Sequence, residues 1–152
     1  MALTRLDQLY RQVILDHSSH PHHHGTLEEA TNQVEMNNPT CGDVIELQLN
    51  LTDNRIEAIR FSGSGCTIST ASASMMTDVV LGKTPKEALA LVDQFSLLVQ
   101  GKEPENLDDL GDAAILSGVA KFPARIRCAT LAWKGLEKAL ATPDETKTNE
   151  KE

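Results

Sequence analysis

The spacing of hydrophobic residues predicts a chain with several amphipathic helices. Apolar side chains recur every three or four positions, the period of an α-helix, in segments separated by glycine, proline or polar runs. The predicted helices run over roughly 4–16, Thr67 to Leu81, Pro85 to about Val99, Ala113 to Val119, and from Phe122-Pro123 to about Leu140. We expect a loop over His17 to Thr26, a glycine break at 62–65 and a polar connection over 100–112.

Another part of the chain alternates hydrophobic and polar residues one by one, as a strand with one solvent-facing side does. It runs from Ile45 to Leu51, and Arg55 to Phe61 returns as a second strand after the turn residues 52–54. Asn32 to Asn37 is a third, shorter candidate. Because strands come first and most helices follow, we predict an α+β domain, with a small antiparallel sheet of about three strands and helices packed on one face.

Composition and charge narrow the function classes. The chain has 152 residues, a length that suits one domain with its own core. The formal net charge of -8 argues against nucleic acid and anionic membrane surfaces as partners, since both need clustered Lys and Arg. No apolar run approaches the ~18 residues of a membrane span, and the N-terminus lacks a signal peptide's apolar block, so we expect a cytoplasmic protein. We assign 1–141 to a single domain and 142–152 to a disordered polar tail.

Cysteine is scarce, and each of the three cysteines lies where a predicted element begins. Cys41 and Asp43 come at the start of a strand, where residues two apart point to the same side. Cys66 lies between a glycine-rich turn and a helix, and Cys128 lies early in the last helix. The positive end of a helix dipole favours a thiolate at such positions. Buried packing is the common role of an isolated cysteine, but it explains poorly three cysteines that neighbour turns and charges.

Convergence of the three thiols with Asp43 would require a cation, because four negative ligands would crowd one point. Tetrahedral zinc accepts cysteine sulfur and aspartate oxygen, and iron accepts the same thiolates in an iron–sulfur cluster. The absence of a Cys-x-x-Cys pair excludes zinc-finger and thioredoxin-like motifs. A domain of this size can fold without a metal, and the ligands are spread over the chain, so we predict a working site rather than a structural one.

Two other chemistries fit the sequence less well. A cysteine hydrolase needs a histidine base, and all five histidines lie between residues 17 and 24, but no oxyanion motif accompanies them. The histidine-rich loop 20–24 could itself bind a metal. Beside Pro21 we expect it instead to be a solvated or partner-facing loop.

Three cysteine motifs together resemble one known family. Their sequences are NNPTCGD, SGSGCTIS with ASASMM, and KFPARIRCATLAW. In this order they resemble the IscU/NifU-type iron–sulfur assembly proteins, and they are most similar to the SufU branch of Gram-positive bacteria. The resemblance extends from Asp16 through about Leu140. It implies the IscU/NifU N-terminal fold, whose architecture is the α+β arrangement predicted above.

The resemblance also implies a mechanism. The residues that would hold zinc are Cys41, Asp43, Cys66 and Cys128. A SufS-like cysteine desulfurase would be the partner that supplies a persulfide, and Cys41 would accept the terminal sulfur and pass it to downstream cluster-building proteins. Such a protein is a sulfurtransferase-type carrier rather than a free-standing enzyme. We add the hypothesis that Arg125 or Arg127 steadies the anionic persulfide.

Two departures separate this sequence from the scaffold branch of the family. That branch has a histidine just before the third cysteine, where this chain has Arg127, and its stretch between the second and third cysteines is shorter. Both departures match the SufU branch and argue against a cluster bound through histidine. The alternative function is a scaffold on which a [2Fe-2S] cluster is assembled on the same three cysteines, with Asp43 as the fourth ligand, and then handed to apo-proteins.

Overall fold

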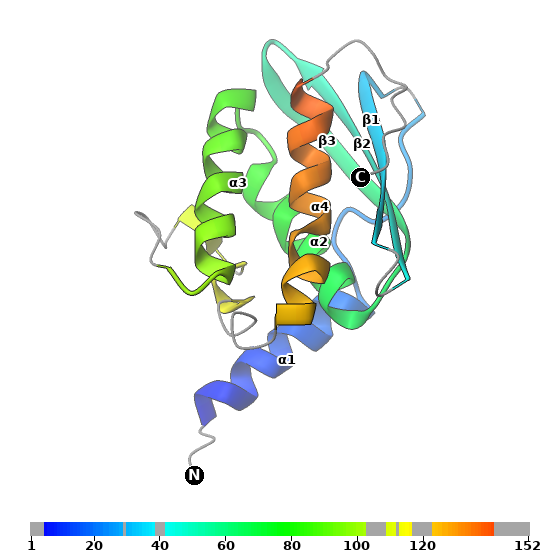
Figure 1. Ribbon diagram of the computed structural model, residues 1–152. Coiled ribbons are helices and arrows are strands. Elements are labelled where there is room, and N and C mark those ends of the chain that lie inside the picture. Colours follow the sequence, from blue (N-terminus) through cyan, green and yellow to red (C-terminus); the bar gives the residue numbers. More distant parts are fainter. Residues whose placement is uncertain are drawn as a thin grey trace.

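The computed structural model describes residues 5–28, 30–38, 42–102, 109–111, 113–116 and 123–141. Within these ranges the chain forms a three-stranded antiparallel sheet and four α-helices, and the helices pack against one face of the sheet (Figure 1). The predicted α+β class and the one-sided packing are confirmed. No helix in the described ranges is both long and apolar enough to cross a bilayer.

The sheet consists of β1 (Asn32–Asn38), β2 (Asp43–Thr52) and β3 (Arg55–Ser64), in the order β1-β2-β3. Alternate residues of β2 are buried, because Ile45, Leu47 and Leu49 face the helices. Asp53 and Asn54 join β2 to β3 and both have positive φ values, 55° and 61°. A two-residue turn with this backbone matches the twist of the flanking strands, so the predicted hairpin is confirmed.

The predicted glycine break at 62–65 was wrong, because β3 continues to Ser64. Ser64 still pairs with Val44, one residue after Asp43. Gly63 has a φ of 120°, and a Cβ there would lie 2.1 Å from the carbonyl oxygen of Val44. Glycine is therefore what lets β3 follow β2 this far. The extra pairing brings the chain that enters the next helix beside Asp43.

The four helices are α1 (Arg5–Ser19), α2 (Thr67–Val80), α3 (Pro85–Val99) and α4 (Pro123–Ala141). α2 and α4 lie against the sheet and against each other, with α1 packed on α2 and α3 packed on α4 (Figure 1). Most of α2 is buried, and it carries a run of small residues from Ala71 to Ser74. These small side chains let the neighbouring helices approach closely, which places α2 at the centre of the helical layer.

Trp133 anchors α4 in the core. Its ring is buried and stacks on Phe95 of α3, with centroids 4.2 Å apart and planes inclined by 6°. The indole N–H donates to Ser72 Oγ (2.9 Å), and the Ser72 hydroxyl donates to the carbonyl of Ala129 (2.5 Å). These contacts fix the rotation of α4 against α2 and α3, and so they set the direction of Cys128, which directly precedes Ala129.

Some predicted boundaries differ from the structure or lie outside it. α1 ends at Ser19 rather than residue 16, so His17 is helical, and Pro21 then excludes further helix because the residue before a proline disfavours the α conformation. Residues 109–111 and 113–116 form 3-10 turns, so the described part of the predicted helix 113–119 is a tighter turn. Most of the polar connection 100–112 and the whole tail 142–152 lie outside the described residues.

Candidate metal centre

Asp43 is a buried acid at the first position of β2, where it is 1% exposed. Its Oδ1 accepts hydrogen bonds from the backbone N–H of Cys66 (2.8 Å) and from the hydroxyl of Ser69 (3.2 Å). Its Oδ2 is buried and has no hydrogen-bond partner among the residues that the structure describes. Burying a carboxylate oxygen without a partner is unfavourable, so this atom marks a place for a cation or a further donor.

Cys66 is the N-cap residue of α2. Its backbone is extended (φ -79°, ψ 173°), and its Sγ accepts from the N–H of Ser69 at 3.5 Å. The preceding Gly65 permits this close turn, since a Cβ there would lie 2.3 Å from Ser69 Oγ and 2.9 Å from Asp43 Oδ1. Ser69 therefore contacts both Asp43 and Cys66. The sequence analysis missed Ser69, although a residue three positions after an N-cap is where capping partners occur.

Cys128 approaches the same place from α4 and is fully buried. The side-chain amide of Asn38, at the end of β1, lies 4.0 Å from its sulfur. The two sulfurs of Cys66 and Cys128 and a carboxylate oxygen of Asp43 all lie within 4.8 Å of one another. The structure thus brings together three of the four predicted ligands, from β2, α2 and α4. Cys41, the fourth, lies outside the described residues.

The donor set of this group, which we call the thiolate centre, fits a metal ion. Two sulfurs and a carboxylate oxygen are ligand types of tetrahedral zinc, and thiolates also hold iron–sulfur clusters. Coordination at ~2.0–2.3 Å would draw ligand atoms that now lie within 4.8 Å to about 3.5 Å apart, a small movement for side chains. Asp43 Oδ2 would then gain the partner that it lacks within the described part of the chain.

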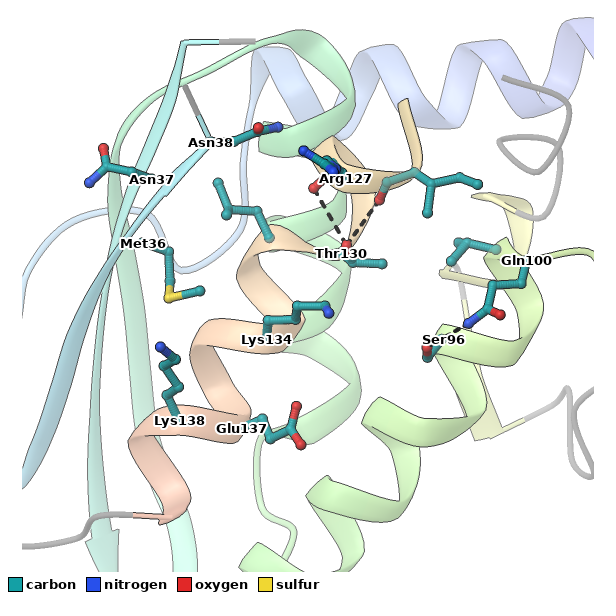
Figure 2. A pocket seen from close by; sticks show the side chains of 13 residues that line it. Met36, Asn37, Asn38, Ser96, Gln100, Arg127, Thr130, Lys134, Glu137 and Lys138 are labelled. Atoms are coloured by element: carbon teal, nitrogen blue, oxygen red, sulfur yellow. Dashed lines mark hydrogen bonds between the residues drawn. The ribbon is translucent and has the colours of Figure 1, made fainter. Parts of the chain in front are cut away.

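A groove of about 840 Å³ opens between α3, α4 and the end of β1 (Figure 2). Arg127 lies on its wall near Asn38, and Asn38 joins the groove to the thiolate centre through its contact with Cys128. Lys134 and Lys138 follow along the same side of α4 (Figure 2). Sequence reasoning missed the groove because its walls come from elements far apart in the chain. Both Arg125 and Arg127 are exposed, and their proposed role toward a persulfide stays a prediction.

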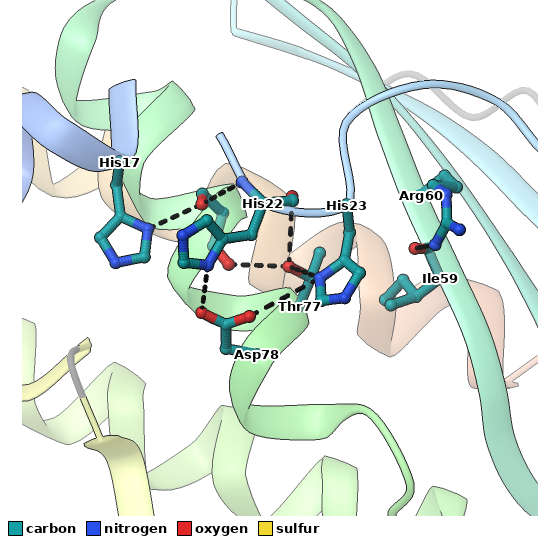
Figure 3. A network of polar contacts seen from close by, with 8 residues as sticks. His17, His22, His23, Ile59, Arg60, Thr77 and Asp78 are labelled. Atoms are coloured by element: carbon teal, nitrogen blue, oxygen red, sulfur yellow. Dashed lines mark hydrogen bonds and ion pairs between the residues drawn. The ribbon is translucent and has the colours of Figure 1, made fainter. Parts of the chain in front are cut away.

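The histidine-rich segment 20–24 is a loop in which His22 and His24 are exposed, and together with His17 of α1 it contacts α2. His17 is 4% exposed and its Nδ1 lies 2.7 Å from Ser74 Oγ. His22 Nδ1 lies 2.6 Å from Asp78 Oδ2, and His23 Nδ1 lies 3.0 Å from Thr77 Oγ1 (Figure 3). The partners on α2 are more than fifty residues away in sequence, and no local pattern reveals them.

The same segment also contacts the sheet. The N–H of Phe61 in β3 donates to the carbonyl of His23 (3.1 Å), and the N–H of Gly25 donates to the carbonyl of Phe61 (2.9 Å). The His24 ring meets the Phe61 ring edge-on at 5.2 Å. No histidine belongs to the group formed by the two described cysteines, which gives the hydrolase hypothesis no support from these residues.

Comparisons with known proteins place this geometry in a family. Residues 9–142 match the model described as "NifU-like N terminal domain". The chain is 56% identical over 140 residues to the "Iron-sulfur cluster assembly scaffold protein IscU" of Streptococcus pyogenes serotype M1, covering 92% of this chain and 87% of that one. It is 53% identical over 136 residues to the "Zinc-dependent sulfurtransferase SufU" of Bacillus subtilis strain 168, covering 90% and 92%.

Solved structures with the same fold support this family assignment. A crystal structure of a protein described only as hypothetical matches with a TM-score of 0.85 and 56% identity, over 89% of this chain and 98% of that chain. A putative iron–sulfur cluster assembly scaffold protein for the SUF system from Fervidobacterium islandicum AW-1 matches with a TM-score of 0.82 and 34% identity, over 88% and 97%. The resemblance drawn from the three cysteine motifs is therefore confirmed, and the chain belongs to the family of NifU-like N-terminal domains.

Proposed function

We propose that this protein accepts sulfur from a cysteine desulfurase and delivers it to iron–sulfur cluster assembly, with zinc as its resident metal. The observation that carries the proposal is the convergence of Cys66, Cys128 and Asp43, together with the buried Oδ2 that has no partner among the described residues. This donor set suits zinc. The relative named a zinc-dependent sulfurtransferase supports the same chemistry.

Cys41 acts as the nucleophile in the proposed reaction. Its thiolate attacks the outer sulfur of a persulfide on the desulfurase, and the sulfur–sulfur bond of that persulfide breaks. The desulfurase cysteine leaves as a thiolate, while the outer sulfur and its hydrogen arrive on Cys41 as a new persulfide. No external oxidant or reductant is needed, because one sulfur–sulfur bond replaces another.

The other residues of the thiolate centre would hold the metal ion and orient its ligands. Cys66, Cys128 and Asp43 would hold the zinc ion, which when bound keeps thiols deprotonated at neutral pH. The N–H of Cys66 and the hydroxyl of Ser69 both bond Asp43 Oδ1, which fixes the orientation of the carboxylate beside the two sulfurs. Arg127, beside Asn38 on the groove, or Arg125 would attract the anionic persulfide. The partner that carries it is a SufS-like desulfurase, and we expect the exchange to take place in the cytoplasm.

A second function has comparable support from the comparisons. The Streptococcus pyogenes relative is named an assembly scaffold, and the same thiolates with Asp43 could hold a [2Fe-2S] cluster for transfer to apo-proteins. Arg127, which stands where the scaffold branch has a histidine, makes sulfur transfer the first choice for this chain.

Metal content and sulfur transfer, measured on one preparation, test the proposal. Protein purified without added iron should be colourless and hold about one zinc per chain in the thiolate centre. With the desulfurase and radiolabelled cysteine it should become labelled, and Cys41→Ala should not, while a Ser64→Ala control is labelled like the native chain. Brown protein with iron and acid-labile sulfide would favour the scaffold function. Undiminished label on Cys41→Ala would exclude Cys41 as the acceptor.

A further inference from the structure

A second group of side chains that could bind a metal lies beside the C-terminal half of α2, and it comes from α1, the following loop and α2 itself. His17, His22 and Asp78 each offer one ligand atom, and these atoms lie within 4.8 Å of one another (Figure 3). Asp78 follows Cys66 by twelve residues, which on a helix that rises about 1.5 Å per residue corresponds to about 18 Å. One ion cannot serve both places, so this group, which we call the histidine cluster, is separate from the thiolate centre.

Ser74 holds two parts of the histidine cluster in place. Its Oγ lies 2.7 Å from the Nδ1 of His17 and accepts the backbone N–H of His22 at 2.8 Å. One hydroxyl on α2 therefore fixes both the ring of the first histidine and the backbone that carries the second. The His17 and His22 rings lie with centroids 4.6 Å apart as a result. Ligands positioned in this way lose little freedom when an ion binds.

His23 is not one of the three candidate ligands, but it contacts one of them, Asp78. Its Nδ1 lies 3.6 Å from Asp78 Oδ1, while Asp78 Oδ2 contacts His22. The backbone of His23 has a φ of 57°, in the left-handed region that few residues other than glycine adopt. This turn directs the side chains of His22 and His23 toward the same helix, as Figure 3 shows. A ligating carboxylate that is oriented by a neighbouring group is the usual arrangement around protein metal sites.

We propose that His17, His22 and Asp78 form a second, exchangeable site for a divalent first-row metal ion, of which Zn²⁺ and Fe²⁺ are the expected occupants. Two imidazole nitrogens and one carboxylate oxygen are donors that suit these ions and disfavour the soft Cu⁺. Three protein ligands leave a coordination position open to solvent. The net charge of -8 on the chain also favours attraction of cations.

The geometry can close on an ion with modest side-chain movement. Ligand bonds of ~2.0–2.2 Å hold neighbouring ligand atoms about 3.3 Å apart at the tetrahedral angle. The 2.6 Å hydrogen bond between His22 Nδ1 and Asp78 Oδ2 must give way to bonds to the ion as the two atoms move slightly apart, and the widest separations in the group, up to 4.8 Å, must shorten. The side chains of His22 and Asp78 are 49% and 37% exposed, so they can rotate while the buried His17 stays in place.

The competing explanation is that these contacts only fasten the loop to α2. A metal titration of the full chain, first loaded with zinc at the thiolate centre, separates the two. We expect the native chain to take up a further equivalent of Zn²⁺, or of Fe²⁺ under anaerobic conditions. Ni²⁺ added to the zinc-loaded chain should broaden the NMR signals of residues 17–23 and 74–78 and leave those around Cys66 sharp.

Matched variants identify the ligands. The double variant His22→Asn with Asp78→Asn should bind the additional metal ion about 100-fold more weakly or worse. The single variant His23→Asn should bind it about 10-fold more weakly. His20→Asn is the control, because His20 is exposed in the same loop and lies outside the cluster, and it should leave the affinity within about twofold. Circular dichroism of each metal-free variant checks the fold, and the mild His23→Asn variant keeps the test valid should the double variant unfold.

Three results would overturn the proposal. They are no further equivalent in the native chain, a further equivalent that survives in the double variant, and an equal loss in His20→Asn. Cys66→Ser supplies the cross-check, since it should remove the thiolate equivalent and leave the histidine-dependent one. Metal binding at the thiolate centre and metal binding at the histidine cluster are thus measured independently.

Discussion

α2 contributes to a candidate metal-binding group at each end, and the two groups differ in donor chemistry and in burial. At its N-terminus, Cys66 meets Asp43 and Cys128, which are 1% and 0% exposed. In its last turns, Asp78 meets His22 and His17, and two of these three side chains are open to solvent. Two of the three sulfur and oxygen donor residues are buried and Cys66 is partly buried, whereas His17 is the one buried residue of the nitrogen and oxygen group.

The two groups differ in how far their polar atoms are satisfied without a metal ion. Asp43 Oδ2 is buried without a partner in the described part of the chain, and such an atom costs about 1–3 kcal/mol until something binds it. His22 and Asp78 bond each other, and water reaches both, so this end is satisfied without an ion. We therefore expect metal binding to stabilise the fold through the thiolate centre and to affect it little through the histidine cluster.

The largest effect on stability should come from Gly63→Ala, a change in β3 that disturbs only the thiolate centre and leaves the histidine cluster intact. A Cβ at this position would meet the Val44 carbonyl oxygen at 2.1 Å in a backbone with a φ of 120°, so we expect a loss of about 3 kcal/mol in the free energy of unfolding. The displaced strand end should also impair metal binding beside Asp43. Urea unfolding and metal titration measure the two effects.

Gly82→Ala is the matched control for this variant. Gly82 also has a positive φ, 85°, but a Cβ there would have no atom within 4 Å. Backbone strain alone should lower the free energy of unfolding of Gly82→Ala by about 1 kcal/mol. Equal losses in the two variants would contradict the role assigned to the close approach at Val44.

Next in size is the response to Cys66→Ser, which changes the donor but keeps the helix start. Serine is among the favoured N-cap residues, so the metal-free fold should be retained. The affinity for zinc at the thiolate centre should fall by about 100-fold or more, because a sulfur ligand is lost. Competition with a chromophoric chelator measures the affinity, and thermal unfolding of the metal-free variant checks the fold. Native-like zinc affinity would refute Cys66 as a ligand.

A smaller effect is expected from Ser69→Ala, which leaves all the ligands in place. Asp43 Oδ1 would keep the N–H of Cys66 and lose the hydroxyl of Ser69. Loss of such an orienting hydrogen bond should weaken zinc binding at the thiolate centre by about 10-fold. The same chelator competition applies, with the exposed Ser64→Ala for comparison. If the two serine variants bind equally well, Ser69 does not orient Asp43.

The smallest effect should follow Asp78→Asn measured without metal. The His22–Asp78 contact is solvent-exposed, and contacts of this kind contribute about 0–1 kcal/mol. Urea unfolding of the metal-free chain should therefore change by less than about 1 kcal/mol. A loss above about 2 kcal/mol would show that the histidine loop is needed for stability, and the contrast between the two ends would disappear.

Local patterns were sufficient to predict most elements, because their burial repeats at the period of the element. Ile45, Leu47 and Leu49 are buried as their alternation indicated, and α3 begins at Pro85, where Thr84 and Glu87 form a capping box. The family, too, followed from the cysteine motifs. The convergence of Cys66 and Cys128 with Asp43 could be inferred only through these motifs, since spacing alone left buried packing open.

The features that the sequence did not predict share one physical cause, which is dependence on a partner distant in sequence. β3 continues through Gly63 because of how closely it approaches Val44, and the histidine segment is ordered by Ser74 and Asp78 on a helix that follows it in the chain. Neither partner changes the local hydrophobic period. The polar character of both segments therefore indicated loops, whereas the folded chain extends one as a strand and fastens the other, still a loop, to a helix.

The contacts of Phe61 with His23 and Gly25 have a consequence for self-association. β3 is at the edge of the sheet, where backbone groups can recruit a strand from another molecule. The histidine segment occupies that edge at its midpoint by taking both hydrogen bonds of Phe61. We expect it to oppose aggregation, and a chain with this segment shortened should expose these backbone groups to intermolecular strand pairing.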